Sequence, residues 1–462
     1  MSSLTILQSR VQPKKVVLVD LGYPYGKKIY MSGSVVAVAA QLMAVGHEID
    51  IVDFSIDRLC GQQVCNLFSK ADFIGASVMG SPGIPLAIKF LNRISGQYIR
   101  SEILLGGQVI SRFSRDQWYR VFGVRARQVT KENISRIFGH LLPSAYDISY
   151  QAVWERMGDR RLKEYLSHEF ALVLSQGCIF GCDYCSADKD QLEFFRDLSV
   201  FRADLKYLLQ KARQFGLHRL ECYASSLDFF QTPKMVFRYL EAMAEVQKET
   251  GVKLAIRCLS CMNTFLAASR QHKDFPELVK RSGLWCVGFG VDGPTEKVWE
   301  EHNKGQNRMS DVEVCYNLCE QIGVRAEVLT VMGYPNDSLR RLRQTVQHLS
   351  GFVRHWPNAV LRPYVARVVL PGNKGWKTQT AVVEKLIANP NQFYNLDICG
   401  LANSTTHPRR WQRWLVNVAY LYVILRYAPF GRCATSPLLP QGGKGWRAAL
   451  AKLINRYMPF DR

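Results

Sequence analysis

A repeated order of short apolar runs and helical patterns constrains this fold more than any other feature of the sequence. The run Lys15–Leu21 (KVVLVDL) is rich in β-branched residues and has the composition of a buried parallel strand, and Glu48–Phe54 (EIDIVDF) is expected to be the next strand. Segments with helical patterning, such as Ser32–Val45, separate these runs. Because a repeated strand–helix order requires a parallel sheet with right-handed crossovers, we expect an α/β protein.

The first series of strands and helices occupies residues 1–140 and predicts a doubly wound, Rossmann-like parallel sheet. Its third and fourth strands are expected at Asp72–Met79 and Glu102–Leu105. Glycines follow the predicted strand ends, and doubly wound sheets bind ligands at that edge. This segment, called the front domain below, is therefore expected to bind a ligand of nucleotide or cofactor size.

A second series begins after a linker, residues 141–167, in which we expect one short helix. Six further strands predict a partial (β/α)6 barrel over residues 168–375, and the chemistry of such a barrel belongs at the carboxyl ends of its strands. The strands are expected at Phe170–Ser175, Arg219–Ala224, Lys253–Arg257, Trp285–Val291, Arg325–Met332 and Ala359–Val369. Residues 376–462 are expected to form a mostly helical C-terminal region with aromatic and basic patches.

Three cysteines directly follow the first predicted barrel strand. Cys178, Cys182 and Cys185 have the spacing C-x3-C-x2-C, and Gly177 and Gly181 allow the backbone to fold tightly around them. Three thiolates can ligate three irons of a [4Fe–4S] cluster and leave the fourth iron open to a substrate or cofactor. A zinc site is the alternative, but zinc usually takes four ligands from paired C-x2-C units, and no nearby ligand completes such a set.

With this loop the chain resembles the radical S-adenosylmethionine superfamily, whose signature is a C-x3-C-x-aromatic-C loop after the first strand of a partial barrel. The resemblance covers roughly residues 165–375. It implies that S-adenosylmethionine chelates the open iron through its amino and carboxylate groups. It also implies that one electron from the cluster cleaves the sulfonium to give a 5′-deoxyadenosyl radical.

The resemblance also implies residues that bind S-adenosylmethionine. Tyr184 matches the aromatic residue before the last cysteine, whose backbone faces the adenine. Ser225, Ser226 and Asp228 stand where the family carries a Gly-Gly-Glu-like stretch that contacts the methionyl amine, although this sequence departs from that stretch.

Three later positions complete this expected site. Arg257 is expected to pair with the methionyl carboxylate as a fork donor, and an ordinary surface arginine is the alternative. Asp292 lies in a segment that resembles the end of the family's fourth strand, and Gly333 lies in a Gly-x-Pro turn like the one after its fifth strand. We assign both residues to S-adenosylmethionine binding.

The front domain followed by this barrel resembles the cobalamin-binding subgroup of the superfamily, in which the loops after the strands surround the corrin and its nucleotide tail. The residues that carry this resemblance, and that we expect to bind cobalamin, are Gly22, Tyr23, Ser77, Met79, Gly106, Gly107 and Gln108. None of the nine histidines lies in an Asp-x-His-x-x-Gly motif, and the subgroup often lacks this motif. A domain that has lost its cofactor and serves as a lid is the alternative.

The resemblance implies a cobalamin-dependent C-methyltransferase that acts on an unactivated carbon of a small molecule or peptide. An electron donor such as flavodoxin or ferredoxin is expected as a partner. Members of the subgroup also perform ring contractions and cyclisations. A rearranging, cyclising or dehydrogenating radical enzyme with a vestigial front domain is therefore the second hypothesis.

The net charge of +21 is concentrated toward the C-terminus. Residues 401–462 contain ten lysines and arginines and one acidic residue, Asp461. Such a segment attracts phosphates, anionic lipid, an acidic partner or an anionic group of the substrate, and a solvated helical face is the alternative. A nucleic-acid-binding protein with a structural cluster is a third hypothesis, which the barrel landmarks disfavour.

The cysteine usage and the N-terminus favour a cytoplasmic protein with reduced thiols. The thirteen cysteines have no regular spacing, and Met1–Ser9 lacks the apolar core of a signal peptide. The longest apolar stretch, Leu415–Leu425, is too short to cross a bilayer, so we expect no transmembrane segment. Cys258 and Cys261 form a C-x2-C pair without further partners, so both are expected to be buried apolar residues, and a second cluster or a catalytic thiol is the alternative.

Overall fold

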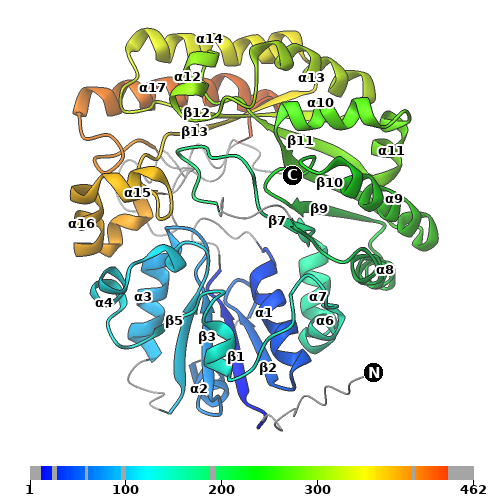
Figure 1. The fold of residues 1–462 in the computed structure, drawn as a ribbon, viewed down its shortest axis with the longest axis vertical. Coiled ribbons are helices and arrows are strands. Elements are labelled where there is room, and N and C mark those ends of the chain that lie inside the picture. Colours follow the sequence, from blue (N-terminus) through cyan, green and yellow to red (C-terminus); the bar gives the residue numbers. More distant parts are fainter. Residues whose placement is uncertain are drawn as a thin grey trace, which may run out of the picture.

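The computed structural model describes residues 12–22, 29–57, 61–94, 100–187, 194–396 and 401–434. Figure 1 shows the front domain, in blue and cyan, stacked against the barrel, in green and yellow, along the long axis of the molecule. Within the described residues, the front domain contains a five-stranded sheet and the barrel a six-stranded sheet. All neighbouring strands in these two sheets are parallel, so the expected α/β class is confirmed.

The strand order of the front domain is β2-β1-β3-β4-β5, which is that of a doubly wound sheet. These strands are β1 (Lys15–Asp20), β2 (Glu48–Asp53), β3 (Phe73–Ser77), β4 (Glu102–Gly106) and β5 (Arg127–Gln128). The direction of strand addition reverses between β1 and β3, and such a point is where doubly wound sheets bind ligands. At the carboxyl edge, the register aligns Asp20 with Ser77 and Ser77 with Gly106.

Helices cover both faces of the front sheet because successive strand residues point to opposite sides. Val16 and Leu18 belong to a core with the first helix and the linker, whereas Val17 and Val19 belong to a second core on the other face. The helices are α1 (Gly33–Ala44), α2 (Gly61–Phe68), α3 (Gly83–Ile94), η1 (Ile110–Arg112), α4 (Arg115–Phe122) and α5 (Ile134–Phe138).

The linker contains two helices, α6 (Gln151–Met157) and α7 (Asp159–Leu166), where the sequence predicted one. Gly158, with φ of 80°, separates them. From α7, Arg161 donates to Asp57 at 2.9 Å and Tyr165 donates to Asp53 at 2.6 Å. The linker is therefore attached to the carboxyl edge of the front sheet.

The barrel sheet follows the chain order β6-β9-β10-β11-β12-β13 and is open, as a partial (β/α)6 barrel requires. Its strands are β6 (Phe170–Val173), β9 (Arg219–Ser225), β10 (Lys253–Ser260), β11 (Leu284–Gly290), β12 (Arg325–Met332) and β13 (Ala359–Val365). A short antiparallel pair, β7 (Ser175–Gln176) and β8 (Phe194–Phe195), flanks the cysteine loop. Strand β10 continues to Ser260, beyond its predicted end at Arg257, and this extension determines where Cys258 and Cys261 lie.

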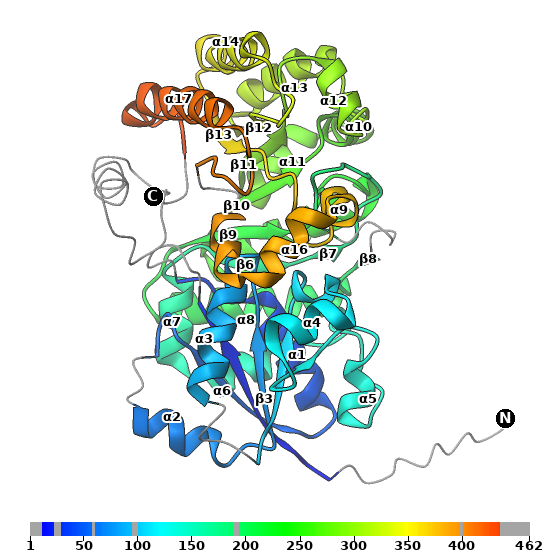
Figure 2. The same ribbon diagram turned by 90° about the vertical axis from the view of Figure 1, so that its left-hand side faces the viewer.

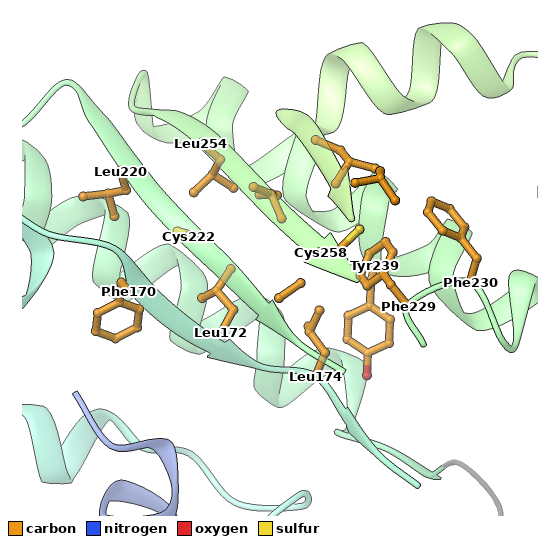
Figure 3. Close-up of a cluster of buried hydrophobic side chains, with 14 of the residues drawn as sticks. Phe170, Leu172, Leu174, Leu220, Cys222, Phe229, Phe230, Tyr239, Leu254 and Cys258 are labelled. Atoms are coloured by element: carbon orange, nitrogen blue, oxygen red, sulfur yellow. The ribbon is translucent and has the colours of Figure 1, made fainter. Parts of the chain in front are cut away.

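The barrel helices pack against the outer face of this sheet. They are α8 (Leu198–Gln214), α9 (Pro233–Thr250), α10 (Met262–Gln271), α11 (Phe275–Ser282), α12 (Glu296–Glu301), α13 (Met309–Ile322) and α14 (Leu339–His355). Figure 3 shows Cys222 and Cys258 among the leucine and aromatic side chains of this core. Cys258 is 0% exposed, so its expected role as a buried apolar residue is confirmed.

The described part of the C-terminal region is mostly helical, as expected, but it divides between the two domains. Helices α15 (Lys374–Thr378), α16 (Thr380–Ala388) and η2 (Pro390–Leu396) pack on the front domain, where Arg120 forms an ion pair with Glu384 at 2.7 Å. Helix α17 (Arg410–Tyr427), followed by η3 (Ala428–Phe430), returns to the barrel beside β13 and α14 (Figure 2). The end of the basic tail, residues 435–462, lies outside the described residues. None of the helices in the described ranges is long and apolar enough to cross a membrane.

The raised pKa of Asp20 should make the stability of the front domain depend on pH. Burial, and then the neighbouring Asp53 carboxylate, raise the pKa of Asp20 from 3.8 to about 7. A folded-state pKa above the unfolded value means that stability is lost as pH rises from about 4 through 7. Asp20→Asn removes this loss but keeps an oxygen for the Gly22 amide, which donates to Asp20 Oδ1 at 2.9 Å. The melting temperature of the variant relative to wild type should therefore increase from pH 5 to pH 8. Parallel pH profiles of the two proteins would contradict this assignment.

Candidate active site

The cysteine loop lies at the carboxyl end of β6, at the mouth of the barrel. Gly177 has φ of 106°, a conformation that favours glycine, so the chain turns sharply just before Cys178. The side chains of Cys178, Cys182 and Cys185 are partly buried. Within the described residues, no group of three or more His, Cys, Asp or Glu side chains converges on a single metal position. Each cysteine of a cubane cluster ligates a different iron, so cluster ligation does not require that convergence.

The segment between α12 and α13 covers the second half of the cysteine loop. Asn303 Nδ2 donates to Gly181 O at 2.8 Å. Gln306 Nε2 donates to Cys182 Sγ at 3.6 Å. These two contacts hold the segment against the cysteine loop.

Tyr184, inside the cysteine loop, joins a buried ion pair. Its hydroxyl donates to Asp292 Oδ2 at 2.5 Å and accepts from Lys304 Nζ at 3.0 Å. Lys304 also forms an ion pair with Asp292, and both side chains are buried. Asp292 Oδ1 accepts from the Val331 amide at 2.8 Å, which fixes the carboxylate between β11 and β12. The cysteine loop is thus held from the opposite side of the barrel mouth.

The electrostatics of this network keep Tyr184 neutral and Lys304 charged. Burial, followed by the Asp292 carboxylate, raises the pKa of Tyr184 well above its ordinary value. Burial lowers the pKa of Lys304, but the charges of Asp292, Cys182 and Cys261 outweigh it, so the pKa is raised. Lys304 therefore brings a buried positive charge close to two cysteine sulfurs.

Asp228 follows β9 and is 1% exposed. Its Oδ1 accepts from Ser260 Oγ at 2.7 Å, the Cys261 amide at 3.0 Å and Thr264 Oγ1 at 2.9 Å. Its Oδ2 is buried and has no hydrogen-bond partner among the described residues. Burial is the main cause of a raised pKa of Asp228. An unpaired buried carboxylate oxygen is costly, and a bound ligand with a donor group would satisfy it.

Arg257 lies in a different environment from the one expected. It forms ion pairs with Glu169 at 3.1 Å and with Glu327 at 3.3 Å, inside the barrel and closer to the amino ends of the strands. Arg362 forms a third pair with Glu327, at 2.8 Å. Since two carboxylates of the chain engage Arg257, this network does not favour the predicted pairing with a methionyl carboxylate.

The remaining residues expected at the S-adenosylmethionine site lie at the carboxyl edge of the barrel. Ser225 ends β9, and Ser226 Oγ accepts from Ser175 Oγ at 2.9 Å. Gly333 has φ of 73° and lies against Val416 of α17, and its carbonyl is in contact with the buried His407. Gly333 therefore fixes the packing of α17 on the barrel.

The described residues among those expected at the cobalamin site lie at the carboxyl edge of the front sheet. Gln108 Nε2 donates to Ser186 O, next to Cys185, at 3.1 Å. A Cβ added at Gly107, which has φ of 131°, would lie 2.4 Å from the Val78 carbonyl oxygen.

The other described front-domain positions lie at the same carboxyl edge of the sheet. The ends of strands β1, β3 and β4 are aligned there, and they bring together Gly22, Ser77 and Gly106. The side chain of Met79 is 40% exposed. Tyr23 lies outside the described residues.

Sequence reasoning missed three residues of the site, Lys304, Gln306 and Cys261. Lys304 is separated from Asp292 by a whole helix, and nothing in the local pattern marks it as that residue's partner. Gln306 carries no motif of its own. Cys261 was expected to be buried like Cys258, but strand β10 ends at Ser260 and leaves Cys261 at the barrel mouth. A longer predicted β10 was the only signal that would have placed it there.

No protein-family model and no curated protein matches the sequence. Among solved structures, the chain is similar to TsrM from Kitasatospora setae, a radical S-adenosylmethionine methyltransferase seen with cobalamin and a [4Fe–4S] cluster bound. The TM-score is 0.60 and the identity 12%, over 80% of this chain and 78% of TsrM. A second TsrM structure, with tryptophan substrate and an S-adenosylmethionine analogue bound, gives the same TM-score and identity.

The chain is also similar to OxsB, a cobalamin-dependent S-adenosylmethionine radical enzyme. The TM-score is 0.57 and the identity 14%, over 83% of this chain and 56% of OxsB. At these identities the comparison shows a shared fold. The expected architecture, a doubly wound front domain followed by a partial barrel, is confirmed.

The buried ion pair predicts a large loss of stability when one partner is removed. Lys304→Met leaves the Asp292 carboxylate buried without its counter-ion, and breaking such a pair costs about 3–5 kcal/mol. In an Asp292→Asn background the same change should cost clearly less, because no charge is left unpaired. Urea unfolding of the four proteins of this cycle measures the difference.

Lys374→Met is the matched control. Lys374 forms an ion pair with Asp183 of the same loop at 2.7 Å, but its side chain is 65% exposed. Exposed pairs contribute about 0.2–1 kcal/mol, so this variant should unfold close to wild type. Equal losses for Lys304→Met and Lys374→Met would show that the Asp292 pair is not an anchor.

Proposed function

We propose that the chain is a radical S-adenosylmethionine enzyme whose [4Fe–4S] cluster is ligated by Cys178, Cys182 and Cys185. The observation that carries this proposal is the position of the three-cysteine loop at the carboxyl end of the first strand of an open six-stranded barrel. The fold shared with TsrM and OxsB supports it. Three partly buried cysteine side chains have the chemistry that iron–sulfur ligation needs.

The site has features that suit S-adenosylmethionine. One-electron reduction of this molecule at the cluster supplies a 5′-deoxyadenosyl radical. The unpaired Oδ2 of Asp228 offers a buried acceptor for the methionyl amine, at the place of the family's Gly-Gly-Glu-like stretch. The buried Oγ–Oγ hydrogen bond between Ser175 and Ser226 lies between β9 and the cysteine loop. We assign Asp228 to binding of the methionyl amine. We assign Ser225 and Ser226 to the S-adenosylmethionine site at the same carboxyl edge of the barrel.

Tyr184, Asp292 and Lys304 act on the cysteine loop rather than on the reacting atoms. Their buried network holds Tyr184 in one position, and Cys185 follows it directly in the chain. The positive charge of Lys304 interacts with Cys182 and Cys261 as well as with Asp292. Because these groups fill the mouth beside the loop, they also exclude water from it.

We further propose that the front domain binds cobalamin and that the enzyme methylates an unactivated carbon of a small molecule or peptide. Bound cobalamin carries the methyl group for such a transfer. The hydrogen bond from Gln108 to Ser186 supports this proposal, because it joins the predicted corrin-binding edge to the predicted cluster loop. The strand reversal between β1 and β3 supports a ligand at the same edge. A small redox protein, such as flavodoxin or ferredoxin, is the proposed electron donor.

Replacing one cluster ligand tests the radical chemistry. Cys182→Ala, reconstituted anaerobically with iron and sulfide, should lose the cluster absorbance and form at least about a hundredfold less 5′-deoxyadenosine than wild type. Liquid chromatography of the nucleoside product measures this loss.

The control for this variant is Cys258→Ala, the same change at a sulfur in the apolar core. It should keep both the iron content and the nucleoside product. Full S-adenosylmethionine cleavage by Cys182→Ala would contradict the proposed cluster.

A glycine substitution tests cobalamin binding separately from the cluster. Gly107→Ala places a methyl group 2.4 Å from the Val78 carbonyl oxygen and strains a backbone that glycine tolerates. Its affinity for hydroxocobalamin should fall about tenfold or more, with unchanged iron content. Corrin absorbance after equilibrium dialysis measures the affinity.

Gly123→Ala is the matched control, because Gly123 has φ of +67° but no atom within 4 Å of the added Cβ. This variant carries the same kind of backbone strain without the collision. If wild type itself binds no corrin, the second hypothesis takes the lead, a rearranging or dehydrogenating enzyme with a vestigial front domain.

A further inference from the structure

A fourth cysteine lies beside the three-cysteine loop. Cys261 follows β10 and precedes α10, at the same end of the barrel as the loop. Gln306 Nε2 lies 3.6 Å from Cys182 Sγ and 3.9 Å from Cys261 Sγ. Because one amide group contacts both sulfurs, the two sulfurs lie within two hydrogen-bond lengths of each other.

The backbone around Cys261 is rigidly held. The Cys261 amide donates to Asp228 Oδ1 at 3.0 Å, and the Met262 amide donates to Asn307 Oδ1 at 3.2 Å. Ser260 Oγ donates to the same Asp228 oxygen at 2.7 Å. The position of the sulfur is thus fixed by the end of β10 and the start of α10.

Asp228 gives a second, independent indication of a ligand at this place. Its side chain is 1% exposed, and its Oδ2 has no partner among the described residues. The same carboxylate binds the backbone of Cys261 through Oδ1. Cys261, whose backbone is held in place, therefore lies beside the buried Asp228 Oδ2 acceptor at the mouth of the barrel.

The electrostatic neighbours of Cys261 belong to the cysteine loop and its anchor. Burial and the Asp228 carboxylate raise the pKa of the Cys261 thiol, whereas Lys304 and Gln306 lower it. Cys178 also contributes, so the sulfur interacts with both ends of the site. The Asp228 carboxylate also acts on Cys258, but the other charges that act on that thiol are those of Arg257, Cys319 and Glu327, and Cys258 lies in the apolar core (Figure 3).

We infer that Cys261 is a fourth cysteine ligand of the cluster when S-adenosylmethionine is absent. This inference rests on the proposed function, because it assumes a cluster on Cys178, Cys182 and Cys185. Full ligation of a [4Fe–4S] cluster takes four cysteines, and Cys261 is the described thiol that lies beside the loop without belonging to it.

Binding of S-adenosylmethionine to the fourth iron then requires a ligand exchange. The iron–sulfur bond to Cys261 breaks and the released thiolate takes up one proton. The methionyl ammonium gives up one proton as its nitrogen forms the new bond to iron. No electron moves in this exchange, and protons and charge balance. The consequence is a cluster whose fourth iron is protected until the cosubstrate arrives.

Oxidation of the cluster distinguishes a protected from an open fourth iron. An open iron is lost on treatment with ferricyanide, which leaves a [3Fe–4S] cluster with its own electron paramagnetic resonance signal. Without S-adenosylmethionine, wild type and Cys258→Ala should resist this conversion. Cys261→Ala should give about fivefold or more of the [3Fe–4S] signal per cluster, and Cys261→Ser, with an oxygen ligand, an intermediate yield.

Several results would overturn the inference. One is a wild-type protein that converts as completely as Cys261→Ala, and another is equal conversion of Cys261→Ala and Cys258→Ala. If Cys261→Ala does not fold, the wild-type and Cys261→Ser yields decide, because a four-cysteine cluster must resist oxidation more than the serine variant. Failure of the proposed function looks different, since wild type would then hold no [4Fe–4S] cluster at all.

Discussion

The buried ion pair between Asp292 and Lys304 is the constraint on which the rest of the site depends. Both charges are taken out of water, which is costly unless each is paired and hydrogen-bonded. The pair meets this requirement by including the Tyr184 hydroxyl and the Val331 amide. The cysteine loop, which has little regular structure of its own, thereby acquires a fixed position relative to β11 and β12.

The path of the chain fixes the front domain against the same loop. The chain leaves the front domain through α6 and α7, forms the barrel, returns to the front domain as α15 and α16, and reaches the barrel again in α17. Cores on both sides of the domain boundary bury these crossings. The hydrogen bond between Gln108 and Ser186 is therefore one of several contacts that fix the front domain against the barrel. Chemistry that passes between two cofactors depends on such fixed positions.

Much of this fold follows from local sequence patterns. Strands buried on both faces, such as β1, are continuous apolar runs, and their spacing by helices determines a parallel sheet. The cysteine spacing is equally local, so its place after β6 was predicted. The break at Gly158 was also visible in principle, but two short helices around one glycine resemble a single helix in a pattern of apolar residues.

Contacts across the barrel mouth did not follow from the sequence, because they join residues that no periodicity relates. The pairing of Tyr184 with Asp292, the approach of Gln306 to two sulfurs and the position of Cys261 at the barrel mouth all depend on the closure of the sheet. Arg257 illustrates the same limit. Its strand position was predicted, but two acidic partners on β12 and before β6 decide its role.

The ion-pair network around Arg257 also bears on where the substrate of the proposed enzyme can lie. Glu169, Arg257, Glu327 and Arg362 fill the interior of the barrel below the cysteine loop. Tyr30 of the front domain belongs to the same electrostatic neighbourhood, since the charge of Glu169 raises its pKa and that of Arg257 lowers it, after the larger effects of burial and Tyr223. A paired and hydrogen-bonded interior excludes a substrate that cannot replace those partners. If the chain is the proposed enzyme, its reactive chemistry therefore belongs at the carboxyl end of the barrel, between the cysteine loop and the carboxyl edge of the front sheet.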